Sequence, residues 1–506
     1  LSNYSYGENV AAMGLIYPSS FQTNQEAAGS FSDWTNLSYL ALVNYSYLDK
    51  YIFDLSFRND GSSRFAMDYR FGSFWSAAVA WNLTEEDFLS DSDIVNSLKL
   101  RASLGETGSN SVGLNSYQSL FGYGGSYNDN GAVSPSSFGN AILTWEKQSQ
   151  YDIGIDYSLL DNWISGSIVA FNRKTSDLLQ SVPLSLTSGH SSQSKNIGEV
   201  ENKGIDFNIN SIVLENDDFN WDFNANLGIN KNKLNKLNSN LDFQLGPSIG
   251  FSQAYPILFM VGQPLGIYWG AQTDGIYADW EEAINSGIAG AAPGEIKYLN
   301  NYVDVDESGE PLAIQEINFD DYVKIGDPNP DFTYSISNNF TYKNWDASIL
   351  FTGQKGGDLF WVDSWQLSGL QKTTNVLSSS FENSWKAPLV YENGSYVYNP
   401  LAGNINNVEH PGAIIDTGAR AISSDRNIYD GSFIRLKNIN IGYNFEFSQG
   451  RNMRVYISGQ NLLVWTDYPG YDPEVRTYTK NPQKRGVDFG TYPGTKSVLF
   501  GLKFNY

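Results

Sequence analysis

Cysteine is absent from the 506 residues of the chain, and histidine occurs only twice, as His190 and His410. A chain without cysteine has no disulfide bonds, no thiolate metal sites and no cysteine nucleophile. Two histidines argue against a histidine-based zinc site and against a Ser–His–Asp centre. Motifs for phosphate cradling or zinc binding are missing too, so we predict that the chain is not an enzyme.

Long apolar runs and clustered basic residues are also missing. No stretch approaches the roughly 18 apolar residues that a transmembrane helix needs. Lysine and arginine number 32 against 55 aspartates and glutamates, which gives a net charge of −23. This balance argues against nucleic acid as a partner, because phosphate contacts need clustered positive charge. The acidic residues lie among asparagine, glycine and serine, which indicates a solvated polar surface, with cation-binding loops as the alternative.

Aromatic residues are abundant, at 15% of the chain, and many segments alternate between apolar and polar residues. A period of two is the pattern of a β-strand with two different faces. Within residues 221–230 one face carries Trp221, Phe223, Ala225, Leu227 and Ile229, and the other carries Asp222, Asn224, Asn226, Gly228 and Asn230. This contrast recurs along the chain and predicts an all-β fold, a transmembrane antiparallel β-barrel with an apolar exterior and a wet interior.

The connections between these strands fall into two sizes. The short ones are residues 48–51, 159–163, 214–221, 342–345 and 447–452, and the long ones are 106–142, 175–200, 232–328, 354–425 and 465–494. The two sizes alternate, as periplasmic turns and extracellular loops do in outer-membrane barrels. A helical pattern is confined to patches such as 278–287. We therefore predict a location in the outer membrane of a Gram-negative bacterium, where the lipid bilayer and its lipopolysaccharide surround the barrel.

Strands long enough to cross the membrane number about 13. Closed single-chain barrels of bacterial outer membranes have an even number of strands. We therefore expect further strands upstream of Leu1, and we expect the polar residues 1–35 to form a long loop outside the cell. The last strand, residues 497–506, places Phe500, Leu502, Phe504 and Tyr506 on the lipid side. As the final strand it must close the barrel by pairing with a first strand that lies outside these residues.

Blocks of distinctive sequence follow one another in a fixed order. They include RNDGSSRF at 58–65, LKLRASLGETGSN at 98–110, LTWEKQSQYDIGIDY at 143–157, NIGEVENKGIDF at 196–207, GDPNPDFTYSISNNFTYKN at 326–344 and DGSFIRLKNINIGYNF at 430–445. In this order they resemble the SusC-like TonB-dependent outer-membrane transporters, although Trp75 stands where that family usually has proline. The resemblance identifies residues 1–506 as the C-terminal part of one receptor barrel of about 22 strands, with the N-terminal plug domain and first strands outside this chain.

The resemblance implies TonB-dependent uptake of a nutrient too large for porins, such as an oligosaccharide or an oligopeptide. It implies two protein partners, a SusD-like surface lipoprotein that lids the barrel and the inner-membrane TonB complex that pulls the plug. Two other functions stay open: a β-rich surface glycan-binding protein without transport activity, and a barrel with a structural or secretion role. Solubility without detergent would indicate the first, and an upstream sequence without a plug would indicate the second.

An acidic loop at residues 302–312 contains the pattern Asp-x-Asp-x-Ser-Gly. Oxygen ligands on alternate residues, followed by glycine at a sharp turn, are typical of the first half of a calcium loop. Position 12 is Gln315 rather than glutamate, and the family resemblance implies that a later aspartate closes the site. The candidate Ca²⁺ ligands are Asp304, Asp306, Ser308, Glu310, Asp320 and Asp321. The alternative is a solvated hairpin tip, and no other cofactor is expected.

Two long loops carry clusters of aromatic residues. The candidates for substrate or partner contact are Trp361 and Trp365 in one loop and Tyr268, Trp269 and Tyr277 in another. Exposed Trp and Tyr rings stack on sugar rings or anchor a partner, because they bury a large area at low entropy cost. The alternative is packing inside the loops.

Charged residues gather near one strand end, at Arg58, Asp60, Gly61, Arg64 and Arg70. We predict structural roles for this block. The arginines pair with aspartate at the rim of the barrel, and Gly61 forms a turn.

Overall fold

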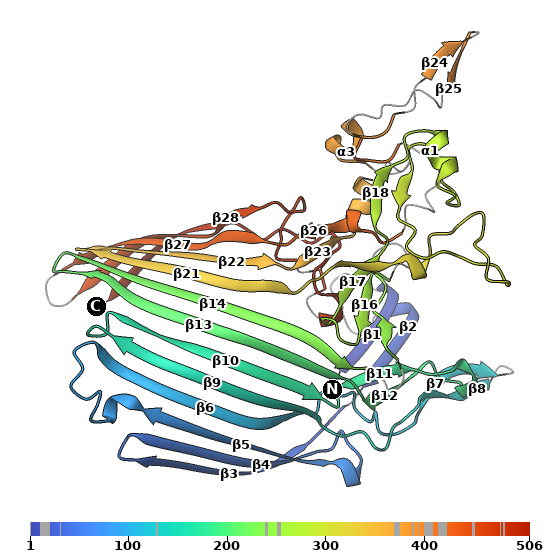
Figure 1. Ribbon diagram of the computed structural model, residues 1–506. Helices are drawn as coiled ribbons and strands as arrows, with labels where there is room; N and C mark the ends of the chain where they lie inside the picture. Colours follow the sequence, from blue (N-terminus) through green and yellow to red (C-terminus); the bar gives the residue numbers. More distant parts are fainter. Residues whose placement is uncertain are drawn as a thin grey trace.

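The structure, a computed structural model, describes residues 2–10, 21–30, 32–127, 130–237, 241–249, 255–368, 375–386, 389–392, 394–398, 408–412, 422–447, 451–475, 477–478 and 481–505. Its main feature is one curved antiparallel sheet of 13 strands (Figure 1). In order across the sheet these are β3 (Asn36–Tyr47), β4 (Tyr51–Ser62), β5 (Phe71–Asn82), β6 (Val95–Ser109), β9 (Glu146–Leu159), β10 (Ile164–Ser176), β13 (Glu199–Glu215), β14 (Phe219–Lys236), β21 (Pro330–Tyr342), β22 (Trp345–Gly356), β27 (Phe433–Glu446), β28 (Asn452–Thr466) and β30 (Ser497–Asn505). Each strand pairs with the sheet strands next to it in the chain, and β3 and β30 form the two edges. The strand count agrees with the prediction.

Tight turns and long loops alternate from β6 onward, as predicted, whereas β5 is flanked by two connections of middle length, residues 63–70 and 83–94. The tight turns lie at one end of the sheet, and the long loops gather at the other end (Figure 1). Leu48 and Asp49 between β3 and β4 have φ angles of 53° and 57°. Two successive residues with positive φ are the requirement of a type I′ hairpin turn, whose twist matches that of the strands.

The register across the sheet sorts side chains onto two faces. Ile205 lies opposite Ile229, and Phe207 lies opposite Leu227, which in turn lies opposite Tyr334. The alternate positions carry polar residues, for example Asn208 opposite Asn226. We call the two sides the apolar face and the polar face. In β30, Phe500 and Leu502 keep 78% and 74% of their surface exposed, as a lipid-facing wall requires, whereas Tyr506 lies outside the described residues.

Smaller elements fill the long loops. Two-stranded pairs are β7 (Leu120–Tyr127) with β8 (Asn130–Ser137), β11 (Leu179–Pro183) with β12 (Ser192–Asn196), β18 (Thr273–Ile276) with β19 (Ile296–Tyr298), and β24 (Leu389–Glu392) with β25 (Ser395–Tyr398). Larger groups are β15 (Phe243–Leu245), β16 (Ile257–Met260), β17 (Ile267–Gly270) and β20 (Val323–Gly326), and β26 (Ile428–Asp430), β23 (Asp358–Trp361) and β29 (Val487–Asp488). The helices are α1 (Trp280–Asn285), α2 (Ser364–Leu367) and α3 (Ser378–Glu382). Helix α1 lies in the patch predicted to be helical, and the described part of the chain contains no helix long and apolar enough to cross a membrane.

The N-terminal stretch differs from the prediction. Residues 1–35 were expected to form a long loop, but β1 (Ser2–Val10) and β2 (Phe21–Ser30) pair as an antiparallel two-stranded sheet. This pair is separate from the 13-stranded sheet.

The charged block near residue 60 differs from the prediction at its arginines and at its glycine. Among the described residues only Arg58 of its three arginines pairs with an aspartate. Arg58 Nε lies 2.7 Å from Asp60 Oδ1, and Arg64 Nη1 donates to the Val112 carbonyl at 2.8 Å. Gly61 does not form a turn, because it lies inside β4 opposite Phe71. A Cβ atom at Gly61 would lie 2.6 Å from the Phe71 ring, so the ring itself requires glycine there.

The largest hydrophobic core lies among the loops and reaches the loop end of the sheet, where β14 contributes Leu234. Leu234, Ile257, Tyr268, Phe360 and Val487 pack together with almost no exposed surface. A single-layered wall has no buried face, because one side contacts lipid and the other contacts water. The loops therefore have to bury their own apolar side chains to hold a fixed shape.

Candidate functional site

The polar face of β13, β14 and β21 carries a row of amide side chains. Asn210 Nδ2 donates to Asn208 Oδ1 at 3.0 Å, and Asn208 Nδ2 donates to Asn226 Oδ1 at 2.7 Å. Asn226 Nδ2 donates in turn to Ser335 Oγ at 3.1 Å. These contacts fix the orientation of each amide and leave further donors and acceptors exposed.

A polar pocket of about 390 Å³ opens beside this row. Its polar lining residues are Ser167, Asp206, Asn208, Asn226, Thr333 and Ser335, and Gly228 also lines it. A Cβ atom at Gly228 would lie 3.4 Å from both Asp206 Oδ1 and Thr333 Oγ1, so the missing side chain helps to create the space. Hydroxyl and amide groups with one carboxylate suit a ligand rich in hydroxyl or amide groups.

Two arginines elsewhere on the polar face, Arg101 and Arg454, are already paired. Arg101 Nε lies 3.0 Å from Asp156 Oδ2, and Arg454 Nε donates to Asp346 Oδ1 at 2.9 Å. These pairs hold neighbouring strands together and use up much of the hydrogen-bonding capacity of the arginines. The amide row is therefore the better candidate for ligand contact on this face.

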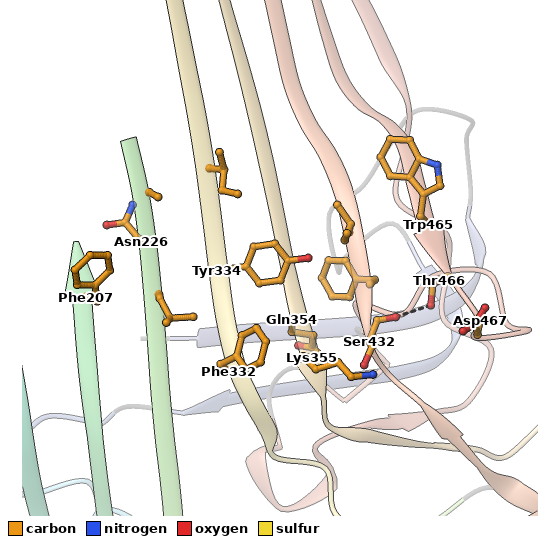
Figure 2. Close-up of a pocket in the computed structure, with 15 residues that line it drawn as sticks. Phe207, Asn226, Phe332, Tyr334, Gln354, Lys355, Ser432, Trp465, Thr466 and Asp467 are labelled. Atoms are coloured by element: carbon orange, nitrogen blue, oxygen red, sulfur yellow. Dashed lines mark hydrogen bonds between the residues drawn. The ribbon is translucent and has the colours of Figure 1, made fainter. Parts of the chain in front are cut away.

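A larger groove, of about 730 Å³, lies mainly on the apolar face near the loop end. Figure 2 shows Phe207, Phe332, Tyr334 and Trp465 around it, together with the Ser432 carbonyl that accepts from Thr466 Oγ1 at 2.9 Å. Gly353 lies opposite both Tyr334 and Ile434, and it presents no side chain between them. Because it lies mainly on the apolar face, this groove suits an apolar ligand.

Three of the five predicted aromatic residues are buried in the loop cores. Tyr268 is fully buried and its hydroxyl donates to the Arg485 carbonyl at 2.9 Å, and Tyr277 and Trp361 are 2% and 7% exposed. Burial raises the pKa of the Tyr268 hydroxyl above its usual value. The burial of these three rings fits the packing alternative.

Trp269 and Trp365 are the two predicted aromatics that keep a partly exposed ring. The Trp365 ring packs edge-on against Phe360, with centroids 5.4 Å apart. Contact of any of the five aromatic residues with a substrate or a partner stays a prediction.

The acidic loop uses its carboxylates to bind its own backbone. Asp306 Oδ1 accepts from the N–H groups of Ser308 at 2.8 Å and Glu310 at 3.0 Å, and from the Ser308 hydroxyl at 2.6 Å. These bonds, led by the Ser308 hydroxyl, lower the pKa of Asp306. Asp321 accepts from two N–H groups of the preceding chain, and Asp304 accepts from the Glu316 N–H at 2.9 Å.

No group of three or more carboxylate or imidazole side chains gathers in a metal-binding arrangement in the described residues. Asp320 is exposed, and its N–H bonds to Asn318. The calcium site drawn from Asp304, Asp306, Ser308, Glu310, Asp320 and Asp321 therefore stays a prediction without geometric support.

Sequence reasoning assigned no special role to the amide row, although its asparagines alternate with apolar residues along each strand. The missing information was the register. Asn208, Asn226 and Ser335 lie on three different strands. Only the pairing of β14 with β13 on one side and with β21 on the other brings them into line.

Comparison with known proteins identifies the family. The model of the family "TonB dependent receptor-like, beta-barrel" matches residues 2–462. TonB-dependent receptor P3 of Formosa agariphila is 36% identical over 486 residues, which cover 93% of this chain and 45% of that receptor. TonB-dependent receptor SusC of Bacteroides thetaiotaomicron is 29% identical over 504 residues, which cover 93% of this chain and 44% of SusC.

Solved structures show the same fold. The structure of the RagAB peptide transporter superposes with a TM-score of 0.76 at 23% identity, covering 96% of this chain and 49% of that chain. The chain spans about half the length of the curated relatives it matches. The family match and the sequence similarity show that the chain belongs to the TonB-dependent receptor-like β-barrel family, as a SusC-like member.

Proposed function

We propose that the chain forms part of the wall of an outer-membrane transporter that takes up a large nutrient, an oligosaccharide or an oligopeptide, in a TonB-dependent manner. The observation that carries the proposal is the two-faced wall of 13 strands in a chain of this family. One face is apolar enough for lipid, and the other presents a row of oriented amides to the lumen. The family consists of receptors and transporters rather than enzymes, and it belongs to the outer membrane of Gram-negative bacteria.

The polar face supports a neutral, hydrogen-bonding substrate. The pocket beside Gly228 offers amides, hydroxyls and one carboxylate, whereas Arg101 and Arg454 on the same face are held by aspartates. Sugars and peptide backbones both match such a surface, because each presents donors and acceptors without requiring a counter-charge. The printed description of the RagAB structures names peptide as the cargo of that transporter, which agrees with one of the two substrate classes.

A SusD-like lipoprotein lid and the TonB complex complete the proposal. The long loops lie together at one end of the strands and bury their own core, which gives a lid a fixed surface to rest on (Figure 1). The similarity to SusC supports this partner, and the TonB complex follows from the family.

Uptake in living cells tests the transport proposal. Cells with and without the complete receptor gene are given fluorescent oligosaccharides or oligopeptides, with and without a protonophore. We expect uptake to require both the gene and the proton gradient, while growth on monomers is unchanged. Binding at the cell surface without uptake would favour the glycan-binding alternative. A tagged receptor that copurifies with no lipoprotein from mildly solubilised membranes would contradict the lid.

A further inference from the structure

Lysines continue the apolar face at the loop end of four neighbouring strands. In β14, Lys231 and Lys233 follow Ile229 with the same period of two, and in β13 Lys203 stands two residues before Ile205. The register places a lysine of β10 and one of β9 on the same face. The five exposed side chains, which we call the basic collar, are Lys147, Lys174, Lys203, Lys231 and Lys233.

The opposite end of the same face is aromatic. Trp221 packs against Phe340 with ring centroids 5.7 Å apart, and Trp345 packs against Tyr443 at 5.0 Å. Aromatic girdles are the usual boundary of an outer-membrane barrel at both interfaces. At the loop end of β9, β10, β13 and β14, lysines occupy the positions where the second aromatic girdle is expected. This difference needs a separate explanation.

Carboxylates only partly neutralise the basic collar. Lys174 Nζ lies 2.9 Å from Glu199 Oε2, and Lys203 Nζ lies 3.0 Å from Glu201 Oε1. Lys147, Lys231 and Lys233 form no ion pair within the part of the chain that the structure describes. The collar thus keeps a positive charge in a chain whose net charge is −23.

The register also sets two lysines directly against each other. Lys203 lies opposite Lys231 across β13 and β14. Like charges in directly opposed positions of a sheet are destabilising. Glu201, which lies opposite Lys233, pairs with Lys203 but leaves Lys231 and Lys233 without an ion pair within the described residues, so an anion bound beside these two ammonium groups offsets the remaining repulsion.

A groove joins the basic collar to apolar surface. It has a volume of about 510 Å³, and its lining includes three lysines and one carboxylate beside apolar residues: Lys203, Lys231, Lys233, Glu201, Ile205 and Ile229. One step further along the same strands, Phe207 and Leu227 line the larger apolar groove of Figure 2. An amphiphile with its anionic group on the lysines can therefore extend its chain along this face.

We propose that the basic collar is a binding site for a lipid of the outer leaflet whose phosphate groups give it a net negative charge. Its phosphate groups bind Lys203, Lys231 and Lys233, and an acyl chain lies over Ile205 and Ile229 toward the groove of Figure 2. The loop end of the strands faces the outer leaflet in barrels of this kind, so the collar stands at the depth of the lipid headgroups. The inference uses the outer-membrane location in the proposed function but not transport itself, and lipid binding is measured without any uptake.

The test measures lipid affinity of the purified full-length receptor in a neutral detergent. Diphosphorylated lipid A is the probe, and phosphatidylcholine and inorganic phosphate are the comparison ligands. The variant is Lys231→Gln/Lys233→Gln, which removes two charges without breaking an ion pair within the described residues. The matched control is Lys50→Gln/Lys343→Gln, which removes two lysines from the turns at the opposite end of the strands. Folding of each variant is checked by its heat-dependent migration in electrophoresis.

Each lysine near a charged lipid surface contributes about fivefold in affinity, so we expect the collar variant to bind lipid A roughly 25-fold more weakly. The control variant keeps its affinity within about twofold, and added salt weakens wild-type binding more than that of the collar variant. Unchanged lipid A affinity in the collar variant overturns the proposal. So does equal affinity for phosphatidylcholine, or inorganic phosphate that binds as tightly as lipid A.

Discussion

Arg435 and Asp472 form an almost completely buried ion pair, with Nη2 2.5 Å from Oδ1 and side-chain exposures of 4% and 6%. Arg435 belongs to β27 in the wall, and Asp472 belongs to the loop between β28 and β30. Asp472 also accepts from the N–H groups of Glu474 at 2.9 Å and Gly494 at 3.2 Å. One carboxylate therefore ties two parts of this long loop to a strand.

Replacing Arg435 by Leu should release this loop. Asp472 would be left buried without its counter-charge, which costs about 3–5 kcal/mol of stability. We expect faster amide exchange in residues 465–475 and a lower unfolding temperature. The double variant Arg435→Leu/Asp472→Leu should recover part of the loss, because the Asp472 charge is then removed, while Glu474, which also pairs with Arg435, keeps Lys437 as a partner at 3.6 Å. The exposed pair Arg101–Asp156 is the matched control, and Arg101→Gln should cost less than about 1 kcal/mol. Equal losses in the buried and exposed pairs would refute the anchoring role.

Filling the polar pocket should hinder uptake while the wall stays folded. At Gly228 a new Cβ meets its nearest atoms at 3.4 Å, so Gly228→Val is accommodated by small shifts of Asp206 and Thr333. We expect uptake of the transported oligomer to fall severalfold, because the valine methyl groups occupy the space next to the amide row. Ala225→Val adds bulk to the same strand on the apolar face and should leave uptake unchanged. Equal uptake by the two variants would remove the pocket from the substrate path.

His410 should make part of the loop region sensitive to acid. Burial, and next the nearby Arg426, lower the pKa of His410, and its buried Nδ1 has no hydrogen-bond partner among the residues that the structure describes. In acid, His410 therefore binds a proton more readily when the segment is unfolded than when it is folded. The stability of the folded segment is full above the unfolded pKa of His410, about 6.5, and is lost as the pH falls below that value. The His410 carbonyl accepts from the Trp385 N–H at 2.9 Å, which makes that amide the reporter.

We expect exchange at Trp385, corrected for the intrinsic pH dependence, to speed up between about pH 7.5 and about pH 5.5. The substitution His410→Asn should abolish the change. Persistence of the same acid response in this variant would assign it to another group.

The calcium site predicted from the sequence is tested by amide exchange of residues 302–312. If Ca²⁺ binds, millimolar calcium should protect the loop relative to EDTA, and Asp306→Asn should abolish the protection. Because Asp306 already accepts three hydrogen bonds, its substitution also loosens the turn in EDTA. For each protein, the exchange rate in calcium is therefore compared with the exchange rate of the same protein in EDTA. Calcium-independent exchange in the wild type would reject the site.

The sequence was sufficient for the wall of the barrel. Alternation in segments such as 221–230 assigned each side chain to a face, and turn spacing gave both the strand count and the sorting of short and long connections. The same reasoning failed at Gly61, because glycine after aspartate resembles a turn in sequence. Its actual constraint is the ring of Phe71 on the next strand.

Loop aromatics were the least predictable part of the candidate site. Trp and Tyr in a long loop look alike in sequence whether they stack on a ligand or pack on one another. Tyr268 is buried because Phe360, a residue from a different loop, packs against it with ring centroids 5.6 Å apart. Contacts of this kind join segments distant in the chain and leave no local periodicity.

Sequence alone determined which residues face lipid and which face the lumen, because alternation along a strand is a local property that follows from the backbone geometry. The tertiary structure decided which residues meet across strands and loops. The register of β13 and β14 placed Asn208 opposite Asn226 and Lys203 opposite Lys231. The packing of a long loop against β27 buried Asp472 beside Arg435. Each of these relationships joins two separate segments, so it exists only once the chain has folded.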